Sequence, residues 1–392
     1  MQMTEEPQIR VGIMERERVG FLLHDYSDGG PVADGVIEAR RTPTGVGWSG
    51  GEAPSLLFTP TGPESWFEIR GVTIGVNFHW ERSENQRFRG ALHIFPHPDE
   101  ADLLIVVNII GVEEYLKSVI SSEMSAQCSE ALLMAHAIMS RSWLLRQLGD
   151  AGSSAKCSAT SEGVCGGSAA PLEIIRWYDR ENHRHYDVCA DDHCQRYQGI
   201  TRQTTPTVSR AVELTRGQVL TCGGKIADAR FHKCCGGLTE LFENCWEPVS
   251  HPYLRCVSDT LPGEERPLCD TDDDTILRQV LNDYDRESRD FFRWEERYTP
   301  GRLSEIIMER SGIDLGEILD LEAMERGASG RIIRLKIVGS KQTVTVGKEL
   351  EIRRWLSPSH LRSSWFDVSR TPGGDWLLKG RGWGHGAGLC QI

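Results

Sequence analysis

The chain has 392 residues, of which 39% are hydrophobic and 26% are charged, and it carries a formal net charge of −13. This acidic balance argues against a nucleic acid as partner, because phosphate binding requires a basic surface. No apolar run approaches the roughly 20 residues that a membrane-spanning helix needs, so we expect no transmembrane segment.

Two features bear on the compartment. The N-terminal residues are acidic and polar, without the basic region and apolar stretch of a secretory leader, which indicates either a cytoplasmic protein or a leader removed by processing. The twelve cysteines are many for a reduced cytosolic enzyme. They suit disulfides in an oxidising compartment or a metal site, so cysteine usage favours an extracytoplasmic location.

The first hundred residues and the Cys/His-rich middle of the chain differ in character. Residues 9–108 alternate short apolar runs with Gly, Pro and Asp, which is typical of β structure, and no long helix is expected there. Residues 149–220 are rich in Cys, His, Ser and Gly with weak periodicity. We expect loops and short elements in this middle segment.

Helical patterns appear in three places. The first covers residues 129–148, capped by Ser129, with an apolar face at helical spacing formed by Met134, Ile138 and Leu145. The others cover residues 274–284 and residues 301–311, the latter bounded by a proline and a glycine. These last two helices predict a small helical insertion.

β character then returns. Apolar and basic residues alternate over residues 333–337, a polar turn follows, and residues 343–346 resume the pattern, which predicts a hairpin. The fold class is therefore α+β, a β-rich body with inserted helices and a Cys/His-rich loop region. We expect four segments: a β-rich segment 1–108, a core segment 109–260 that holds Glu123 and the Cys/His-rich insertion, a helical insertion 261–325 and a C-terminal β segment 326–392.

Two charged side chains stand out near the first helix. Glu123 precedes the Ser129 cap, where a carboxylate is favoured by the helix dipole, so its presence has a purely structural explanation. Arg141 falls on the apolar stripe of the helix, so its charge needs a polar partner or a cleft unless it snorkels to the surface. We expect Arg141 to hold Glu123 or to contact a substrate.

Glycine occupies every second position from Gly380 to Gly388. An extended backbone there would leave one face bare and align Arg381, Trp383 and His385 on the other. Such a strand suits stacking on a sugar, or tight packing in a core.

The middle segment concentrates soft metal ligands. Two cysteines and three histidines lie within twelve residues, a density suited to tetrahedral zinc: His183, His185, Cys189, His193 and Cys194. A Cys189–Cys194 disulfide closing a short loop is the alternative. Cys157 and Cys165 flank a Ser/Gly loop and look like a disulfide, whereas the spacings of the remaining cysteines do not predict a pairing.

Four blocks in order resemble the signature of the stage II sporulation protein D/LytB family. They are GVEEYLKSVISSEM at 111–124 with AHAIMSRS at 135–142, FHKCCGGLTE at 231–240, LRSSWF at 361–366 and GRGWGHG at 380–386. Two departures accompany the match. The last block normally continues past the Gln-Ile at which this sequence stops, so we expect a truncated or divergent C-terminal strand, and Cys234 and Cys235 replace small hydroxylated residues.

The resemblance implies a protein of the cell envelope acting on peptidoglycan. The family contains lytic transglycosylases that cleave peptide-free glycan strands and also non-catalytic enhancers of an N-acetylmuramoyl-L-alanine amidase. It implies that Glu123 is catalytic, with Arg141 beside it, and that a structural zinc is held by His183, Cys189, His193 and Cys194. It further implies glycan-binding residues at His232, Gly236, Gly237, Thr239, Glu240, Arg381, Trp383 and His385. No organic cofactor is expected, and a redox or metal-sensing role is an alternative that rests on cysteine number alone.

Overall fold

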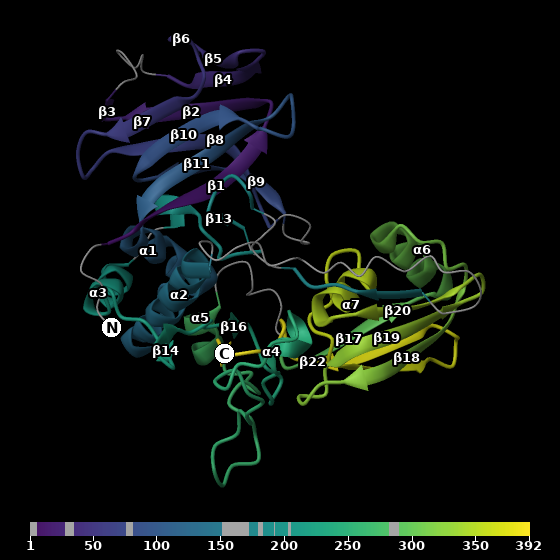
Figure 1. Cartoon of the computed structure of the whole chain (residues 1–392). Helices are drawn as coiled ribbons and strands as arrows, with labels where there is room; N and C mark the ends of the chain where they lie inside the picture. The colour runs from purple at the N-terminus through teal and green to yellow at the C-terminus, as the bar shows by residue number, and fades with distance from the viewer. Residues whose placement is uncertain are drawn as a thin grey trace. The chain divides into compact units, whose positions relative to one another are not determined.

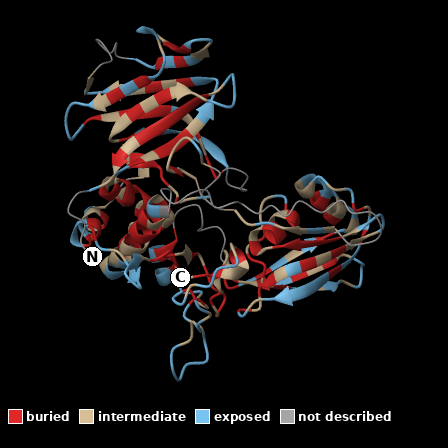
Figure 2. Ribbon diagram, viewed as in Figure 1, coloured by how far each residue is buried: buried red, intermediate tan, exposed pale blue. Residues whose placement is uncertain are grey.

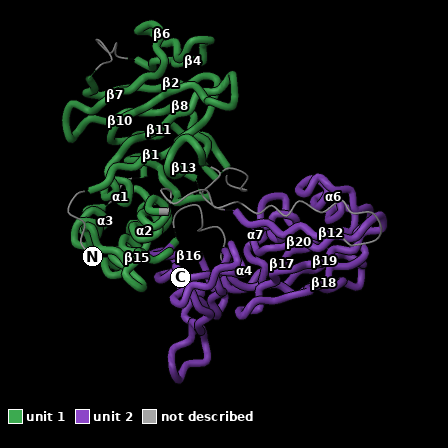
Figure 3. Tube along the Cα trace, viewed as in Figure 1, with its two compact units in different colours: residues 1–153, 180–228, 281–284 green, residues 154–179, 229–280, 285–392 purple. Residues whose placement is uncertain are grey.

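The computed structural model describes residues 6–27, 35–75, 81–150, 172–178, 183–191, 193–202, 205–281 and 290–392 (Figure 1). The described chain divides into two compact units (Figure 3). Unit 1 comprises residues 1–153, 180–228 and 281–284, and unit 2 comprises residues 154–179, 229–280 and 285–392. The units are interleaved along the chain and cut across the four segments expected from the sequence. Each is described separately below.

Two six-stranded sheets form the β part of unit 1. The first has the order β13-β1-β11-β10-β7-β3, and its strands are β13 (Val188–Cys189), β1 (Gln8–Arg16), β11 (Leu104–Gly111), β10 (Ala91–Pro96), β7 (Leu56–Pro60) and β3 (Tyr26–Ser27). The second has the order β6-β5-β4-β2-β8-β9, and its strands are β6 (Gly51–Ala53), β5 (Gly45–Trp48), β4 (Ile37–Thr42), β2 (Arg18–His24), β8 (Trp66–Ile74) and β9 (Arg82–Phe88). This confirms the β structure expected for residues 9–108.

Aromatic side chains join these two sheets. The Phe58 ring of β7 lies 5.5 Å from the Phe21 ring of β2 and 5.4 Å from the Trp48 ring of β5. Both phenylalanines are buried, and burial of large rings contributes much of the stability of a sheet packing. The red band along the strands in Figure 2 marks this core.

Among the described residues of unit 1, four helices come after β11, and the first of them follows it directly. They are α1 (Val112–Glu123), α2 (Glu130–Asp150), the 3₁₀ helix η2 (Gly199–Arg202) and α3 (Pro206–Leu214), and a small hairpin of β14 (Thr221–Cys222) and β15 (Lys225–Ile226) completes the unit. The predicted helix over 129–148 is confirmed as α2, and the Ser129 hydroxyl accepts the N–H of Leu132 at 3.3 Å. Helix α1 is not predicted from the sequence. Its N-cap Gly111 makes no side-chain cap hydrogen bond and its C-cap is Met124, so no local signal marks either end.

Unit 2 contains a four-stranded sheet, a three-stranded sheet and a two-stranded ladder. Their orders are β12-β20-β19-β18, β17-β22-β21 and β16-β23. The strands are β12 (Leu172–Ile175), β20 (Thr343–Gly347), β19 (Ile332–Gly339), β18 (Ile318–Arg326), β17 (Arg293–Tyr298), β22 (Trp376–Arg381), β21 (Phe366–Arg370), β16 (Phe231–His232) and β23 (Leu389–Cys390). β19 and β20 pair antiparallel, which confirms the predicted hairpin.

The helices of unit 2 are short. They are α4 (Phe242–Cys245), α5 (Asp274–Val280), α6 (Pro300–Ser311) and α7 (Glu349–Trp355). α6 confirms the third predicted helix, with Thr299 capping its start and Gly312 ending it at a φ of 73°. α5 begins where predicted but ends at Val280, and Tyr284 lies outside the described residues. Among the described residues, no helix combines the length and apolar character that crossing a membrane requires.

Candidate functional site

Glu123 is the last residue of α1. Val112, Tyr115, Leu116, Val119 and Ile120 are buried at helical spacing, which fixes the helix against the body of unit 1. Met124 follows with no exposed surface, so the half-buried Glu123 carboxylate has an apolar neighbour on its C-terminal side. The sequence pattern predicts this residue close to a helix N-terminus. It lies instead at a helix C-terminus, where the dipole disfavours negative charge.

A backbone amide compensates for this placement. The N–H of Arg196 donates a hydrogen bond of 2.8 Å to Oε1 of Glu123. Hydrogen bonds to an ionised carboxylate are stronger than neutral ones, and this one favours the charged form. The Glu123 carboxylate therefore has a buried apolar residue beside it and a backbone N–H donor on one of its oxygens.

The segment 195–198, which provides this amide, is anchored by its side chains. Gln195 accepts a hydrogen bond from the Tyr115 hydroxyl and donates one to the Ser140 carbonyl, both at 3.3 Å, so it joins α1 to α2. The Tyr197 hydroxyl donates to Oδ1 of Asn108 on β11 at 2.7 Å. We call residues 195–198 the strap. Its four residues form no motif that would predict this role from the sequence.

Tyr115 is buried close to several groups that can carry negative charge. Burial raises the pKa of its phenol well above the ordinary value, and negative charge on Cys194, Cys189 and Glu123 adds to this effect. Tyr115 therefore remains neutral, and its hydroxyl donates a hydrogen bond to Gln195 of the strap.

Four predicted ligands come together directly before the strap. One ligand atom from each of His183, Cys189, His193 and Cys194 lies within 4.8 Å of all the others. Nε2 of His183 is 3.1 Å from Nδ1 of His193. Hydrogen bonds from the Cys194 thiol, and then from the two histidines, lower the pKa of Cys189 to about 2.

This geometry fits a tetrahedral ion. Ligands about 2.0–2.3 Å from a zinc centre lie about 3.3–3.8 Å from one another, and two thiolates with two imidazoles are a common closed set. Cys189 and Cys194 are both free thiols, so the alternative disulfide is not formed. His185 lies elsewhere, with Nε2 3.2 Å from a carboxylate oxygen of Asp99. Cys157 and Cys165 lie outside the described residues.

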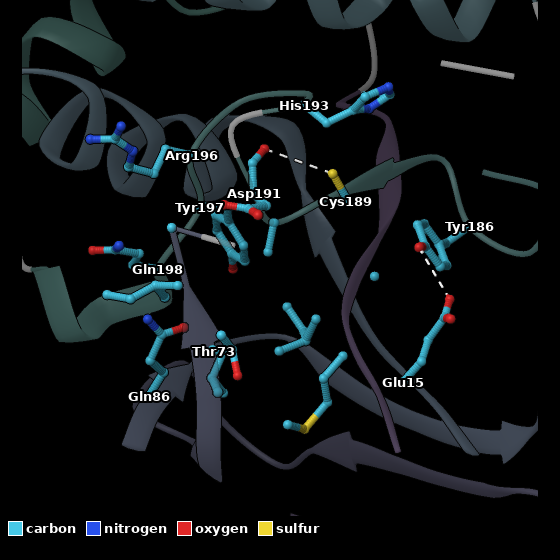
Figure 4. A pocket seen from close by; sticks show the side chains of 17 residues that line it. Glu15, Thr73, Gln86, Tyr186, Cys189, Asp191, His193, Arg196, Tyr197 and Gln198 are labelled. Atoms are coloured by element: carbon cyan, nitrogen blue, oxygen red, sulfur yellow. Dashed lines mark hydrogen bonds between the residues drawn. The ribbon is translucent and has the colours of Figure 1, made fainter. Parts of the chain in front are cut away.

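A pocket of about 490 Å³ adjoins this ligand group (Figure 4). β1 and β8 line one side, and residues around the strap line another, among them Cys189, His193 and Arg196. Glu123 is not one of the lining residues. Arg196 nevertheless connects the two places, because its backbone amide binds Glu123 while the residue itself lines the pocket.

Arg141 has a different carboxylate partner from the one expected. Its Nε and Nη2 donate to the two oxygens of Glu113 at 3.0 and 2.5 Å, and Nη1 donates to the Gln218 carbonyl at 3.1 Å. Arg141 has no exposed surface, and Glu113 is 4% exposed. The expected pairing with Glu123 is thus corrected: helix α1 turns Glu113, at its first turn, toward α2. No local signal in the sequence predicts Glu113 as this partner.

The predicted glycan-binding residues belong to unit 2, and several are engaged within it. Glu240 has no exposed surface; its oxygens accept from Asn244 at 2.9 Å and from the Ser329 hydroxyl at 2.5 Å. The Thr239 hydroxyl donates to the Arg255 carbonyl at 2.8 Å. Burial lowers the pKa of His232 to about 3, which leaves a neutral ring that donates to the Ala387 carbonyl.

The alternating glycines do not form an extended strand beyond Arg381. Gly382, Gly384 and Gly386 have φ values of 75°, 95° and 82°, a region that favours glycine. A Cβ on Gly386 would lie 2.3 Å from the buried Arg331 guanidinium, so only a residue without a side chain leaves room for this arginine. The expected alignment of Arg381, Trp383 and His385 on one strand face is therefore wrong.

The three side chains have separate surroundings in unit 2. The Arg381 guanidinium lies 4.5 Å from the Trp365 ring centre. The Trp383 ring centre is 5.2 Å from that of Phe291. The His385 ring centre is 4.6 Å from that of Trp246. Gly236 and Gly237 adopt φ values of 75° and 112° in the turn after Cys235.

Two family models match separate parts of the chain. Residues 100–222, which hold Glu123, the ligand group and the strap, match the family model described as stage II sporulation protein. Residues 240–388 match a domain of unknown function, DUF8618. An uncharacterized protein of Brachyspira hyodysenteriae is 24% identical over 306 residues, or 78% of this chain. The chain spans 65% of that relative's length.

Proposed function

We propose, from the match of residues 100–222 to the stage II sporulation protein family model, that the chain cleaves the glycan strands of bacterial peptidoglycan as a lytic transglycosylase. The substrate is peptide-free glycan, and the products end in 1,6-anhydro sugars. We also propose an extracytoplasmic location, because this substrate lies outside the cytoplasm. The observation that carries the proposal is the placement of Glu123 at the end of α1, held by the Arg196 amide.

A transglycosylase needs one carboxyl group. The protonated Glu123 donates its proton to the glycosidic oxygen as the bond to the anomeric carbon breaks. The carboxylate then takes the proton of the sugar's own 6-hydroxyl, whose oxygen attacks the anomeric carbon, so no water is consumed. A hydrolase would usually place two carboxylates across the bond. The amide of Arg196 stabilises the anionic half of this cycle.

Arg141 acts as a positioning residue in this proposal. Its buried pair with Glu113 joins the first turn of α1 to the middle of α2, and α1 ends on Glu123. The planar guanidinium binds both carboxylate oxygens at once, which an ammonium group cannot reproduce.

We propose a structural zinc ion at His183, Cys189, His193 and Cys194. Bound there, it supplies a closed tetrahedral crosslink and no reaction chemistry. Its role is to hold the loop that leads into the strap, and so to fix the Arg196 amide against Glu123.

Mass spectrometry of peptide-free glycan after incubation tests the activity. The parent chain should release 1,6-anhydro ends, and Glu123→Gln should lower the rate by at least about 100-fold while glycan binding is retained. Glu114→Gln is the matched control, since Glu114 lies on the same helix and pairs with Lys117 at 2.9 Å.

The remaining outcomes distinguish the alternatives. Anhydro products from Glu123→Gln at the parent rate would remove Glu123 from the reaction. Hydrated reducing ends would replace the transglycosylase with a hydrolase. Unchanged strands that the chain still binds, together with a faster partner amidase, would identify a non-catalytic enhancer of an N-acetylmuramoyl-L-alanine amidase.

A further inference from the structure

Three thiols from distant parts of the sequence meet in unit 2. Cys235 follows β16, Cys269 lies in the loop before α5, and Cys390 is on β23. The Sγ atoms of Cys235 and Cys269 are 3.4 Å apart. Ligand atoms of these three cysteines and of Asp259 all lie within 4.8 Å of one another, and each cysteine is free.

The backbone holds these groups in place. The N–H of Cys235 donates to Sγ of Cys390 and the N–H of Gly237 donates to Sγ of Cys235, both at 3.3 Å. Such N–H groups stabilise a thiolate, the form of cysteine that binds metals. β16 and β23 pair in parallel with His232 opposite Cys390, which brings the end of the chain to this place.

Asp259 belongs to the same arrangement. Its Oδ2 accepts the N–H of Cys269 at 2.9 Å, and its own N–H donates to the Gly237 carbonyl at 3.0 Å. The loop carrying Cys269 is thus tied to the turn that follows Cys235. The carboxylate thus positions Cys269 through its backbone amide, and it also contacts the thiols of Cys269 and Cys235.

We propose that Cys235, Cys269, Cys390 and Asp259 form a second metal site, which binds one zinc ion or another thiophilic divalent cation. Thiolates around tetrahedral zinc lie about 3.8 Å apart, because each is about 2.3 Å from the ion, and the observed spacing is close to this value. The ligands come from residues up to 155 positions apart, so the ion would crosslink the C-terminal strand to the rest of unit 2.

Nearby positive groups suit an anionic site. Three thiolates, one carboxylate and a divalent ion leave a net charge of −2. The Arg331 guanidinium donates to the Cys235 carbonyl at 3.1 Å, and Arg293 lies within electrostatic reach of Cys269. Cys234 also has thiol contacts with Cys269 and Cys390, so it competes with Asp259 for the fourth ligand position. We assign Asp259 because Asp259, and not Cys234, belongs to the group whose ligand atoms all lie within 4.8 Å of one another.

Metal analysis of the full chain tests this site independently of the glycan activity. To remove the other metal group, the background is the double variant Cys189→Ser, Cys194→Ser. We expect one zinc ion per chain in this background and none after adding Cys269→Ser. Cys256→Ser, at a free thiol of unit 2 outside the cluster, is the matched control and should retain the ion. Cys234→Ser should also retain it if Asp259 is the fourth ligand. Cobalt(II) bound in place of zinc should show thiolate charge-transfer absorption.

Two further measurements keep the result unambiguous. Asp259→Asn is nearly isosteric and should lower zinc affinity by at least about 10-fold without unfolding unit 2, as judged by circular dichroism. Metal-free protein whose Cys235, Cys269 or Cys390 is joined in a disulfide would overturn the proposal. Loss of the ion from Cys234→Ser with retention in Asp259→Asn would overturn the assignment of Asp259 as ligand.

Discussion

The backbone N–H of Arg196 donates a 2.8 Å hydrogen bond to Oε1 of Glu123. Arg196 stands two residues after Cys194, the last member of the His/Cys ligand group. The position of the carboxylate therefore depends on the segment 183–198. Among its described residues, regular structure is limited to the short strand β13, so a crosslink would add to its stability.

Disrupting the His/Cys ligand group should impair Glu123 without touching it. We expect Cys194→Ser to lose one zinc ion per chain, to melt at a lower temperature, and to cleave glycan about 10- to 100-fold more slowly. Cys222→Ser, which changes an exposed thiol of unit 1, is the control. Metal analysis and cleavage assays on the same preparations check this, and parent metal content and rate in Cys194→Ser would contradict it.

Breaking the Glu113–Arg141 pair should destabilise unit 1. Glu113→Ala leaves a buried cation without its partner, which typically costs about 3–5 kcal/mol in the free energy of unfolding. Arg141→Lys should also destabilise, and its loss of cleavage should follow the loss of folded protein. Denaturant unfolding measures both, with Arg146→Lys on the same helix as control. Slow cleavage by a fully stable Arg141→Lys would instead indicate that Arg141 acts on the reaction itself, through the position of Glu123 or through a contact with glycan.

Adding a methyl group to Gly386 should destabilise unit 2 more than adding one to Gly374. Both glycines have left-handed φ values, 82° and 89°, so both substitutions carry about 1–2 kcal/mol of backbone strain. Only at Gly386 would the new Cβ displace the Arg331 guanidinium, and we expect about 1–3 kcal/mol of additional loss. Equal unfolding free energies for the two alanine variants would show that Arg331 moves without cost.

Acid should destabilise unit 2 through His232. This side chain is 4% exposed and its pKa is lowered to about 3, mainly by burial and then by the charge of Arg331. Because the pKa in the folded state lies below the unfolded value of about 6.5, the neutral ring stabilises the fold above pH 6.5, and this contribution is lost as the pH falls toward 3.

The expected loss between pH 6.5 and 4.5 is about 2–3 kcal/mol, at about 1.4 kcal/mol per pH unit for one proton. His232→Gln should reduce the decline by that amount in denaturant titrations. His24→Gln, at an exposed position of unit 1, should leave it unchanged. An unaltered pH profile for His232→Gln would mean that other groups carry the acid sensitivity.

Local signals in the sequence were sufficient for several elements. α6 begins at Pro300 after a threonine cap and ends at Gly312, and each of these residues acts through its own backbone preferences. The β19–β20 hairpin follows from alternation and a polar turn in the same way. The His/Cys ligand group was also predictable, because its four members lie within twelve residues of the chain.

Contacts between distant segments were decided by the tertiary structure alone. Arg196 reaches Glu123 across 73 positions, and Arg141 reaches Glu113 across 28. Neither partner is determined by local propensity, because the choice depends on how α1 packs against α2 and the strap. The sequence by itself established which residues could carry charge and bind metal; packing decided which of them meet, since a buried charge takes the partner that the fold brings within hydrogen-bonding distance.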